Sequence, residues 1–348
     1  MRRSTSHYPE QMVTARRPIP VETVFADPIA VTPPRRPHSV RRTTTHESTR
    51  PDGFDGPVTL AATGRDLVTG PHGTARVVGE AWLEIDAAFA DGIVRRLDLH
   101  PGEERLAGLV GSSVYAGLRA RVEEALPGEM SGGSVRAQLL DDLPTTLMLS
   151  GRALRVAGLP MGMSGRGSGS SPVDMCAGWA EGGMAMAHRT ELGPPLTVGP
   201  VAPPMEDALD PLSWHHVGPL PPWSTRRRRR LDIWDEDGTL RIDPFFRDTF
   251  VDEDRIETVV HEWSVTAEVD PVGRRVLSCA ASLGPLPFLE CPGSAASAGR
   301  LAGLDLDDLR RTVRKSFVGP STCTHLNDTL RSLADVGALS DVLQRNGD

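Results

Sequence analysis

The chain has 348 residues, of which 39% are hydrophobic and 24% are charged, a composition typical of a globular protein long enough for two domains. Its formal net charge of -8 argues against generic nucleic-acid binding, because contacts to phosphate need a net or clustered positive face. No hydrophobic run approaches a membrane span, and four cysteines are too few for a secreted disulfide framework. We therefore expect a cytoplasmic protein with neither a membrane nor a nucleic-acid partner.

The N-terminal segment, residues 1–50, is rich in Arg, Thr, Pro and His and shows no apolar period. Such a segment buries too little hydrophobic surface to offset the entropy that is lost on ordering. We predict that residues 1–50 form a disordered tail.

Residues 51–150 begin with a strand-like segment at 75–86, and a turn at Asp91-Gly92 leads into a second apolar segment at 93–99. This pattern predicts a β-hairpin. The sequence Arg-Leu-Ala-Gly-Leu follows at 105–109, and helical periodicity then extends to Leu143. The segment therefore reads as strands followed by helices.

The next segment, residues 151–225, is dominated by Gly, Met and Pro, which favours a long connection over a third core. It contains Cys176, close to Trp179. The basic run Arg226 to Arg230 is interpreted as a solvated approach to a strand that begins near Leu231, with docking of an acidic partner as the alternative.

Residues 226–340 repeat the order of elements seen in 51–150. Strand-like segments lie at 259–270 and 274–283, Arg-Leu-Ala-Gly-Leu returns at 300–304, and leucine periods follow to about residue 333. Matching hairpins, helices and an identical five-residue segment in the same order predict a duplication. The expected fold is α+β, with two related copies, each an antiparallel β-sheet followed by two or three helices on one face.

The cysteines are distributed unevenly between the two copies. The first copy has none, whereas the second has Cys279, Cys291 and Cys323. We predict that Cys323 lies in the first turn of a helix capped by Ser321 or Thr322, where free amides and the helix dipole favour a thiolate. Cys291 precedes Pro292, a residue suited to a helix start.

Two interpretations of these cysteines remain open. Cys291 and Cys323 either share a ligand site with the nearby His325 or are small buried hydrophobic residues, as free cysteine often is. Cys279 is expected in the core, and Cys176 either covers the site or packs within the connector.

Two other side chains in the second copy are candidates for chemistry. His261 falls on the apolar face of its strand and is interpreted as a satisfied core histidine, since His261-Glu262 alone is not a zinc-protease motif. Asp248 follows Phe245-Phe246-Arg247 and is interpreted as a turn residue rather than a carboxylate ligand.

The segments Glu290-Cys291-Pro292 and Thr322-Cys323-Thr324-His325-Leu326 resemble the bacterial family called domain of unknown function 2889, over residues 57 to 340 and in a two-copy form of actinobacterial type. Arg247-Asp248-Thr249 and Val260-His261-Glu262-Trp263 look like the strand region of that family. The resemblance implies that Cys176 joins Cys291, Cys323 and His325 in a Cys3His site, a usual composition for tetrahedral zinc. The order of Cys291, Cys323 and His325 is also similar to iron–sulfur scaffold proteins of the NifU type.

Three functions remain open from the sequence. The first is a metal-binding protein that holds zinc or an iron–sulfur centre on Cys176, Cys291, Cys323 and His325. The second is a thiol-dependent enzyme acting on an acyl or thioester substrate, with Cys323 as nucleophile and His325 as base. The third is a non-catalytic interaction module that binds a protein partner through the tail and the connector.

Overall fold

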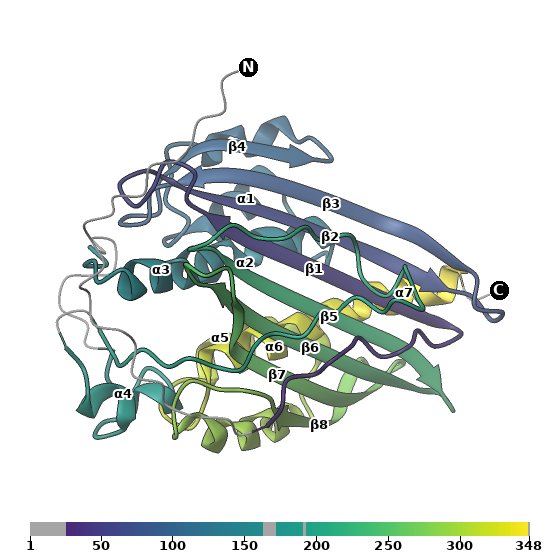
Figure 1. Cartoon of the computed structure of the whole chain (residues 1–348). Helices are drawn as coiled ribbons and strands as arrows, with labels where there is room; N and C mark the ends of the chain where they lie inside the picture. The colour runs from purple at the N-terminus through teal and green to yellow at the C-terminus, as the bar shows by residue number, and fades with distance from the viewer. Residues whose placement is uncertain (1–25, 163–171, 191–192, 347–348) are drawn as a thin grey trace.

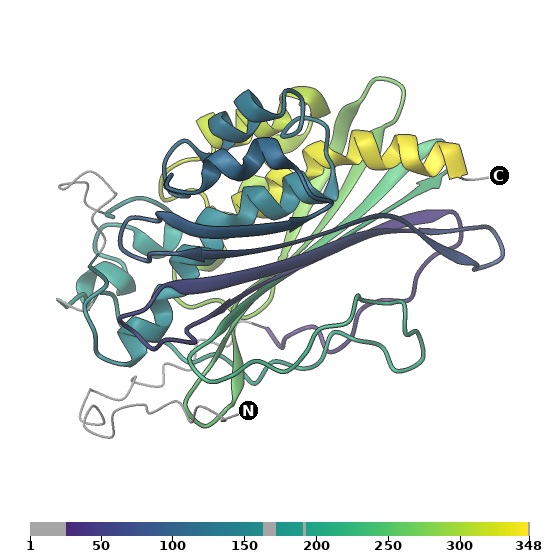
Figure 2. The ribbon, with the colours of Figure 1, turned by 90° about the horizontal axis from the view of Figure 1, so that it is seen from above.

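The structure is a computed structural model that describes residues 26–162, 172–190 and 193–346 (Figure 1). It confirms the α+β class, with one eight-stranded antiparallel sheet and helices over one of its faces (Figure 2). The strands are β1 (Ser39–Thr49), β2 (Val58–Thr69), β3 (Ala75–Ala87), β4 (Val94–His100), β5 (Thr225–Glu236), β6 (Thr239–Val251), β7 (Glu257–Asp270) and β8 (Arg275–Leu283). The α-helices are α1 (Leu118–Ala125), α2 (Val135–Leu149), α3 (Gly151–Val156), α4 (Met184–Ala187), α5 (Leu306–Ser316), α6 (Thr324–Ser332) and α7 (Val336–Asn346), and the 3-10 helices are η2 (Glu104–Leu109), η3 (Ala177–Trp179), η4 (Cys291–Leu301) and η5 (Leu333–Asp335).

The strand order is β4-β3-β2-β1-β5-β6-β7-β8, so each half of the sheet runs outward from its centre in chain order. The two central strands, β1 and β5, pair antiparallel from Ser39 opposite Trp234 to Ser48 opposite Thr225. We call β1–β4 with η2 and α1–α3 the first half, and β5–β8 with η4 and α5–α7 the second half. The halves share one continuous sheet instead of forming separate sheets.

The central strand β1 corrects the prediction of a disordered tail over 1–50, because residues 39–49 lie in the middle of the sheet. Residues 1–25 lie outside the described residues. The strand buries polar side chains on both faces: Arg41 binds Asp232 with two hydrogen bonds of 2.7 Å, and Arg42 binds Asp66 in the same way. Ion pairs replace the apolar period that usually reveals a strand.

The basic run Arg226 to Arg230 lies within β5, and all five side chains are buried, so the interpretation as a solvated approach to a strand is wrong. Successive side chains point to opposite faces of a strand. Arg227 and Arg229 therefore reach carboxylates of the helices, whereas Arg228 reaches Glu206 on the other side.

The face of the sheet opposite the helices is covered by extended chain (Figure 2). Thr32 donates its backbone N–H to Met205 (3.2 Å), which joins the two segments that run over this face. The Trp214 indole donates to Thr45 on β1 (3.1 Å), so the segment is tied to the sheet. The connector between α3 and β5 also contains η3 and α4.

No helix among the described residues is both long and apolar enough to span a membrane.

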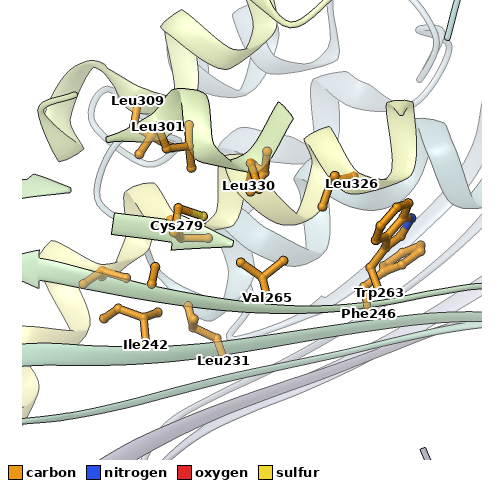
Figure 3. Close-up of a cluster of buried hydrophobic side chains, with 14 of the residues drawn as sticks. Leu231, Ile242, Phe246, Trp263, Val265, Cys279, Leu301, Leu309, Leu326 and Leu330 are labelled. Carbon is orange, nitrogen blue, oxygen red and sulfur yellow. The ribbon is translucent and has the colours of Figure 1, made fainter. Parts of the chain in front are cut away.

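Each half has its own apolar core between its strands and its helices. In the second half, Figure 3 shows Trp263 and Phe246 of the sheet near Leu326 of α6, and Cys279 among apolar neighbours. Cys279 is thus a core residue, as predicted. A row of buried polar and charged side chains at the centre of the sheet separates the two cores.

We call this row the polar seam. It consists of buried side chains on the helix-facing side of β1 and β5 and of the carboxylates that meet them: Arg42, His46, Asp142, Arg227, Arg229, Asp328 and Asp335. Asp142 of α2 in the first half accepts hydrogen bonds of 2.6 and 2.9 Å from Arg229 in the second half. Asp335 of η5 accepts one of 3.1 Å from Arg42. Buried charges are tolerated when they are paired in this way, so the seam fixes how the halves meet.

Candidate metal centre

Three side chains from three elements converge at one end of the polar seam: Asp248 of β6, His261 of β7 and His325 of α6. A nitrogen or oxygen atom of each lies within 4.8 Å of those of the other two. His325 Nε2 is 3.7 Å and His261 Nδ1 is 3.8 Å from the same oxygen, Asp248 Oδ2. No other group of three His, Cys, Asp or Glu side chains in the described parts of the chain meets this distance criterion.

The β6–β7 pairing places two of these residues opposite each other. Asp248 pairs with His261, but the next pair is Thr249 with Val259, so Val260 is the extra residue of a β-bulge. A bulge bends its strand and redirects the neighbouring side chains, and bulges are frequent beside functional sites. Asp248 therefore lies within a strand, and its interpretation as a turn residue is wrong.

His325 reaches the same point from the helix side. Cys323 is itself the N-cap of α6, in an extended conformation and without a side-chain capping bond, so the prediction that it lies inside a first turn capped by Ser321 or Thr322 is wrong. This start places His325 in the first turn, with its ring stacked on that of His261 at a centroid distance of 3.6 Å.

Arg227 holds the carboxylate in place. Its Nε and Nη2 donate to the two oxygens of Asp248 at 2.9 and 3.0 Å, and neither side chain is exposed to solvent. The remaining Nη1 donates to Asp328 at 3.3 Å. A planar guanidinium that binds both carboxylate oxygens fixes their orientation, so Asp248 is positioned before any ligand arrives.

Both imidazoles at this point are neutral at physiological pH. Burial and the positive charge of Arg227 lower the pKa of His325 to about 3, and burial and the neighbouring His325 lower the pKa of His261 well below its usual value. The buried Nδ1 of His261 has no hydrogen-bond partner in the described structure. The prediction of a satisfied core histidine therefore fails at this atom. A neutral imidazole nitrogen with no partner is available to bind a metal.

The spacing is close to what one ion requires. Two ligand atoms about 2.1 Å from a tetrahedral ion are about 3.4 Å apart, and the oxygen–nitrogen distances of 3.7 and 3.8 Å exceed this by a few tenths of an ångström. The His261 and His325 side chains are 12% and 20% exposed, whereas Asp248 is fully buried. An ion would thus approach from the imidazole side.

The three predicted cysteine ligands lie around the start of α6. Ala177, next to Cys176, donates its N–H to the carbonyl of Thr322 (2.7 Å), and the backbone at Gly178 packs against the sulfur of Cys291. The connector therefore covers Cys291 and Cys323. However, none of the cysteines joins His325 in the group within 4.8 Å, because the imidazole faces Asp248.

These thiols are protonated at neutral pH. Burial and the nearby Cys176 raise the pKa of Cys323 to about 12, although the amides of Leu326 and His325 lower it. Burial raises the pKa of Cys176 and of Cys291 as well. The thiolate expected from the helix start is thus opposed by desolvation, which is the larger effect here.

Sequence reasoning identified His325 as a site residue but assigned different roles to Asp248 and His261. One signal was available. Asp248 lies four residues before the loop 252–256 and His261 lies five residues after it, so a hairpin closed by that loop brings them close to each other across the two strands. The polar triplet Arg247-Asp248-Thr249 interrupts the apolar residues of β6 and obscured that hairpin.

Comparison with known proteins gives one match. Residues 225–338 match a family described as "Protein of unknown function (DUF2889)", and this segment begins at the first residue of β5 and ends in α7. The match supports the predicted family resemblance for the second half, and it contains Asp248, His261 and His325. No curated protein and no solved structure matches the chain.

Proposed function

We propose that this protein binds one divalent transition metal ion, with zinc as the best candidate, through Asp248, His261 and His325. The observation that carries the proposal is the convergence of one carboxylate and two neutral imidazoles from three elements within 4.8 Å. Two histidines and one carboxylate suit zinc or iron(II). Three protein ligands leave a coordination position for water or substrate, as in catalytic rather than structural zinc sites.

The surroundings support binding by this set. Arg227 orients Asp248 through both oxygens, and such outer hydrogen bonds commonly fix the ligands of metal sites. The lowered pKa values of His261 and His325 leave no proton to displace from either ring at neutral pH. An iron–sulfur centre is held by thiolate ligands, and no cysteine belongs to the group of three side chains within 4.8 Å on which the proposal rests.

The test is titration of metal-free, untagged protein with Co²⁺ and Zn²⁺, followed by the visible spectrum of cobalt and by calorimetry. We expect one ion per chain, and at least tenfold weaker binding in His261→Gln and in His325→Gln. His188→Gln, an exposed histidine outside the site, serves as the matched control. Unchanged binding in both site variants would reject the proposal.

A further variant separates this ligand set from the Cys3His set that the family resemblance implies. Cys323→Ala should leave cobalt binding within about twofold if Asp248, His261 and His325 hold the ion. It should abolish binding, and remove the sulfur-to-cobalt absorption, if Cys176, Cys291 and Cys323 do. All four cysteines are free, which also supports our proposal that the protein resides in the reducing cytoplasm.

We also propose that the two halves descend from one duplicated unit. The mirrored strand order and the repeated segment at 105–109 and 300–304 support this. In this proposal only the second half carries the metal site, because Arg136-Ala137-Gln138-Leu139 stands in the first half where the second half has Cys323-Thr324-His325-Leu326. Sequences of many relatives provide the test: profiles of the two halves should align strand for strand, and a failure to align would contradict the duplication.

A further inference from the structure

A groove of about 830 Å³ lies where the helices of the two halves meet. Its walls are α1 and the turn after it on one side, and α5, η5 and the start of α7 on the other. It is remote in the chain from the metal ligands and contains none of them. Its volume falls in the range of small-molecule sites, which are commonly about 300–1,000 Å³.

The lining is rich in cations, although the chain as a whole is acidic. The groove is bordered by Arg119, Arg274, Arg310, Arg311, Arg314 and Lys315. Its acidic residues are Glu123, Asp307 and Asp335. Positive groups thus outnumber negative ones here, whereas the full chain has 38 Lys and Arg against 46 Asp and Glu.

The cations divide into a floor with buried ion pairs and an exposed rim. On the floor, Arg119 and Arg310 both bind the buried Asp141, and Arg310 also binds Asp335. These ion pairs join α1, α2 and α5 and are structural.

On the rim, Arg274 and Arg311 form exposed pairs with Asp307 and Asp308, and such pairs are weak enough to exchange. Arg314 and Lys315 form neither an ion pair nor a side-chain hydrogen bond with another described residue. Arg314 and Lys315 therefore offer two cations to an anionic ligand.

The remaining lining is aliphatic. Met130 and Leu306 contribute to it together with Ala120, Ala334 and Ala338, and no aromatic side chain lines the groove. This wall suits a flexible aliphatic chain, whereas a flat ring would lack a stacking partner.

We infer that the groove binds a small molecule that carries phosphate groups on an aliphatic arm, with the phosphates at Arg314 and Lys315. Phosphate is the anion that best uses several converging cations. The aliphatic arm lies along Met130 and the alanines. The inference does not depend on the metal site, so His261→Gln should bind the same ligand as the unaltered protein does.

The experiment is calorimetric titration of the full-length chain with coenzyme A, and in parallel with inorganic tripolyphosphate. Coenzyme A carries three phosphates, an aliphatic arm and an adenine ring, and the ring is expected to stay in solvent because the groove offers it no stacking partner. We expect coenzyme A to bind at least about tenfold more tightly than tripolyphosphate, and its binding to weaken as salt rises from 50 to 300 mM. The double variant Arg314→Ala/Lys315→Ala should weaken coenzyme A binding at least about tenfold. Both side chains are exposed, so the fold should persist.

The matched control is Arg95→Ala/Arg189→Ala, which removes two exposed positive charges elsewhere and changes the net charge equally. Binding within about twofold of the unaltered protein is expected there. Absence of coenzyme A binding, or equal losses in the two double variants, would overturn the inference. If coenzyme A and tripolyphosphate bound with equal affinity, the part of the inference that places an aliphatic arm in the groove would be overturned.

Discussion

Arg227 is the most connected charge of the polar seam, and we predict that removing it costs more stability than removing its principal partner. The comparison is between Arg227→Met and Asp248→Asn. In Arg227→Met, Asp248 loses its ion pair with arginine. It remains fully buried, with two neutral histidines beside it. In Asp248→Asn, Arg227 keeps Asp328 at 3.3 Å and Asp142 at 3.7 Å.

The magnitudes follow from this difference. A buried charge left without its partner typically costs about 3–5 kcal/mol, which is the value expected for Arg227→Met. Loss of a charge-assisted hydrogen bond, with the remaining charges still paired, costs about 1.5–3 kcal/mol, which is the value expected for Asp248→Asn. The exposed variant Arg95→Met should change stability by less than about 0.5 kcal/mol.

The cost of Arg227→Met should also depend on pH. In the unaltered protein the pKa values of His261 and His325 are depressed, so their contribution to stability is complete above the unfolded value of about 6.5 and is lost as pH falls. The positive charge of Arg227 is one of the causes that lower both histidine pKa values, so removing Arg227 should raise these pKa values in the folded state. The folded variant then binds more protons than the unaltered protein, so its deficit should shrink between pH 7.5 and 5.5.

The assay is urea unfolding followed by tryptophan fluorescence, with a chelator present so that metal binding does not contribute. The chain has six tryptophans, and Trp263 is fully buried beside the site. The slopes of the transitions should agree among variants, so that midpoints report stability. An Asp248→Asn cost equal to or above that of Arg227→Met, or a deficit that is the same at both pH values, would refute the reasoning.

Three further outcomes are expected. Because the His325 pKa is lowered to about 3 and that of His261 is also lowered, zinc affinity in a chelator competition should stay within about tenfold between pH 7.5 and 5.5, and a steeper fall would contradict neutral imidazoles. Because burial raises the pKa of Cys323 to about 12, iodoacetamide should label it slowly at pH 7.5 and rapidly in urea; fast labelling of the folded protein would instead favour the thiol enzyme. A methyl group added at Gly64 would lie 2.7 Å from a side chain of α2, so Gly64→Ala should lower the unfolding free energy by about 1–3 kcal/mol, whereas Gly102→Ala, which meets no atom within 4 Å, should not.

The outer strands could be predicted from the sequence, and the central ones could not. β3 and β7 bury alternate apolar side chains on one face and show the usual two-residue period. β1 and β5 bury arginines, threonines and aspartates on both faces, so their composition resembles that of a solvated segment. Many of the ion pairs that satisfy them come from distant parts of the chain, such as Asp232 for Arg41, 191 positions away, and Asp142 for Arg229, 87 positions away. Local patterns cannot show such partners.

Only part of the candidate site could be predicted from the sequence, because local patterns do not show which residues from separate elements come together. The Cys-Thr-His box directed attention to His325, which lies within 4.8 Å of Asp248 and His261 in the structure. The box also suggested that the cysteines and His325 face one ion, yet the extended N-cap at Cys323 separates the sulfur from the ring, which faces Asp248. Asp248 and His261 can be recognised as candidate ligands only when the β6–β7 register, with its bulge at Val260, is known.

The antiparallel pairing of β1 with β5 also limits how this molecule can be shortened. A fragment that keeps only the family-matched segment, residues 225–338, would have β5 as an unprotected border, open to association with any strand that meets it. The same cut would remove Asp142 and leave Arg229 without its two closest acceptor oxygens. Expression of residues 225–338 by themselves therefore calls for a replacement of the missing strand, and the natural replacement is a second β5 supplied by another molecule.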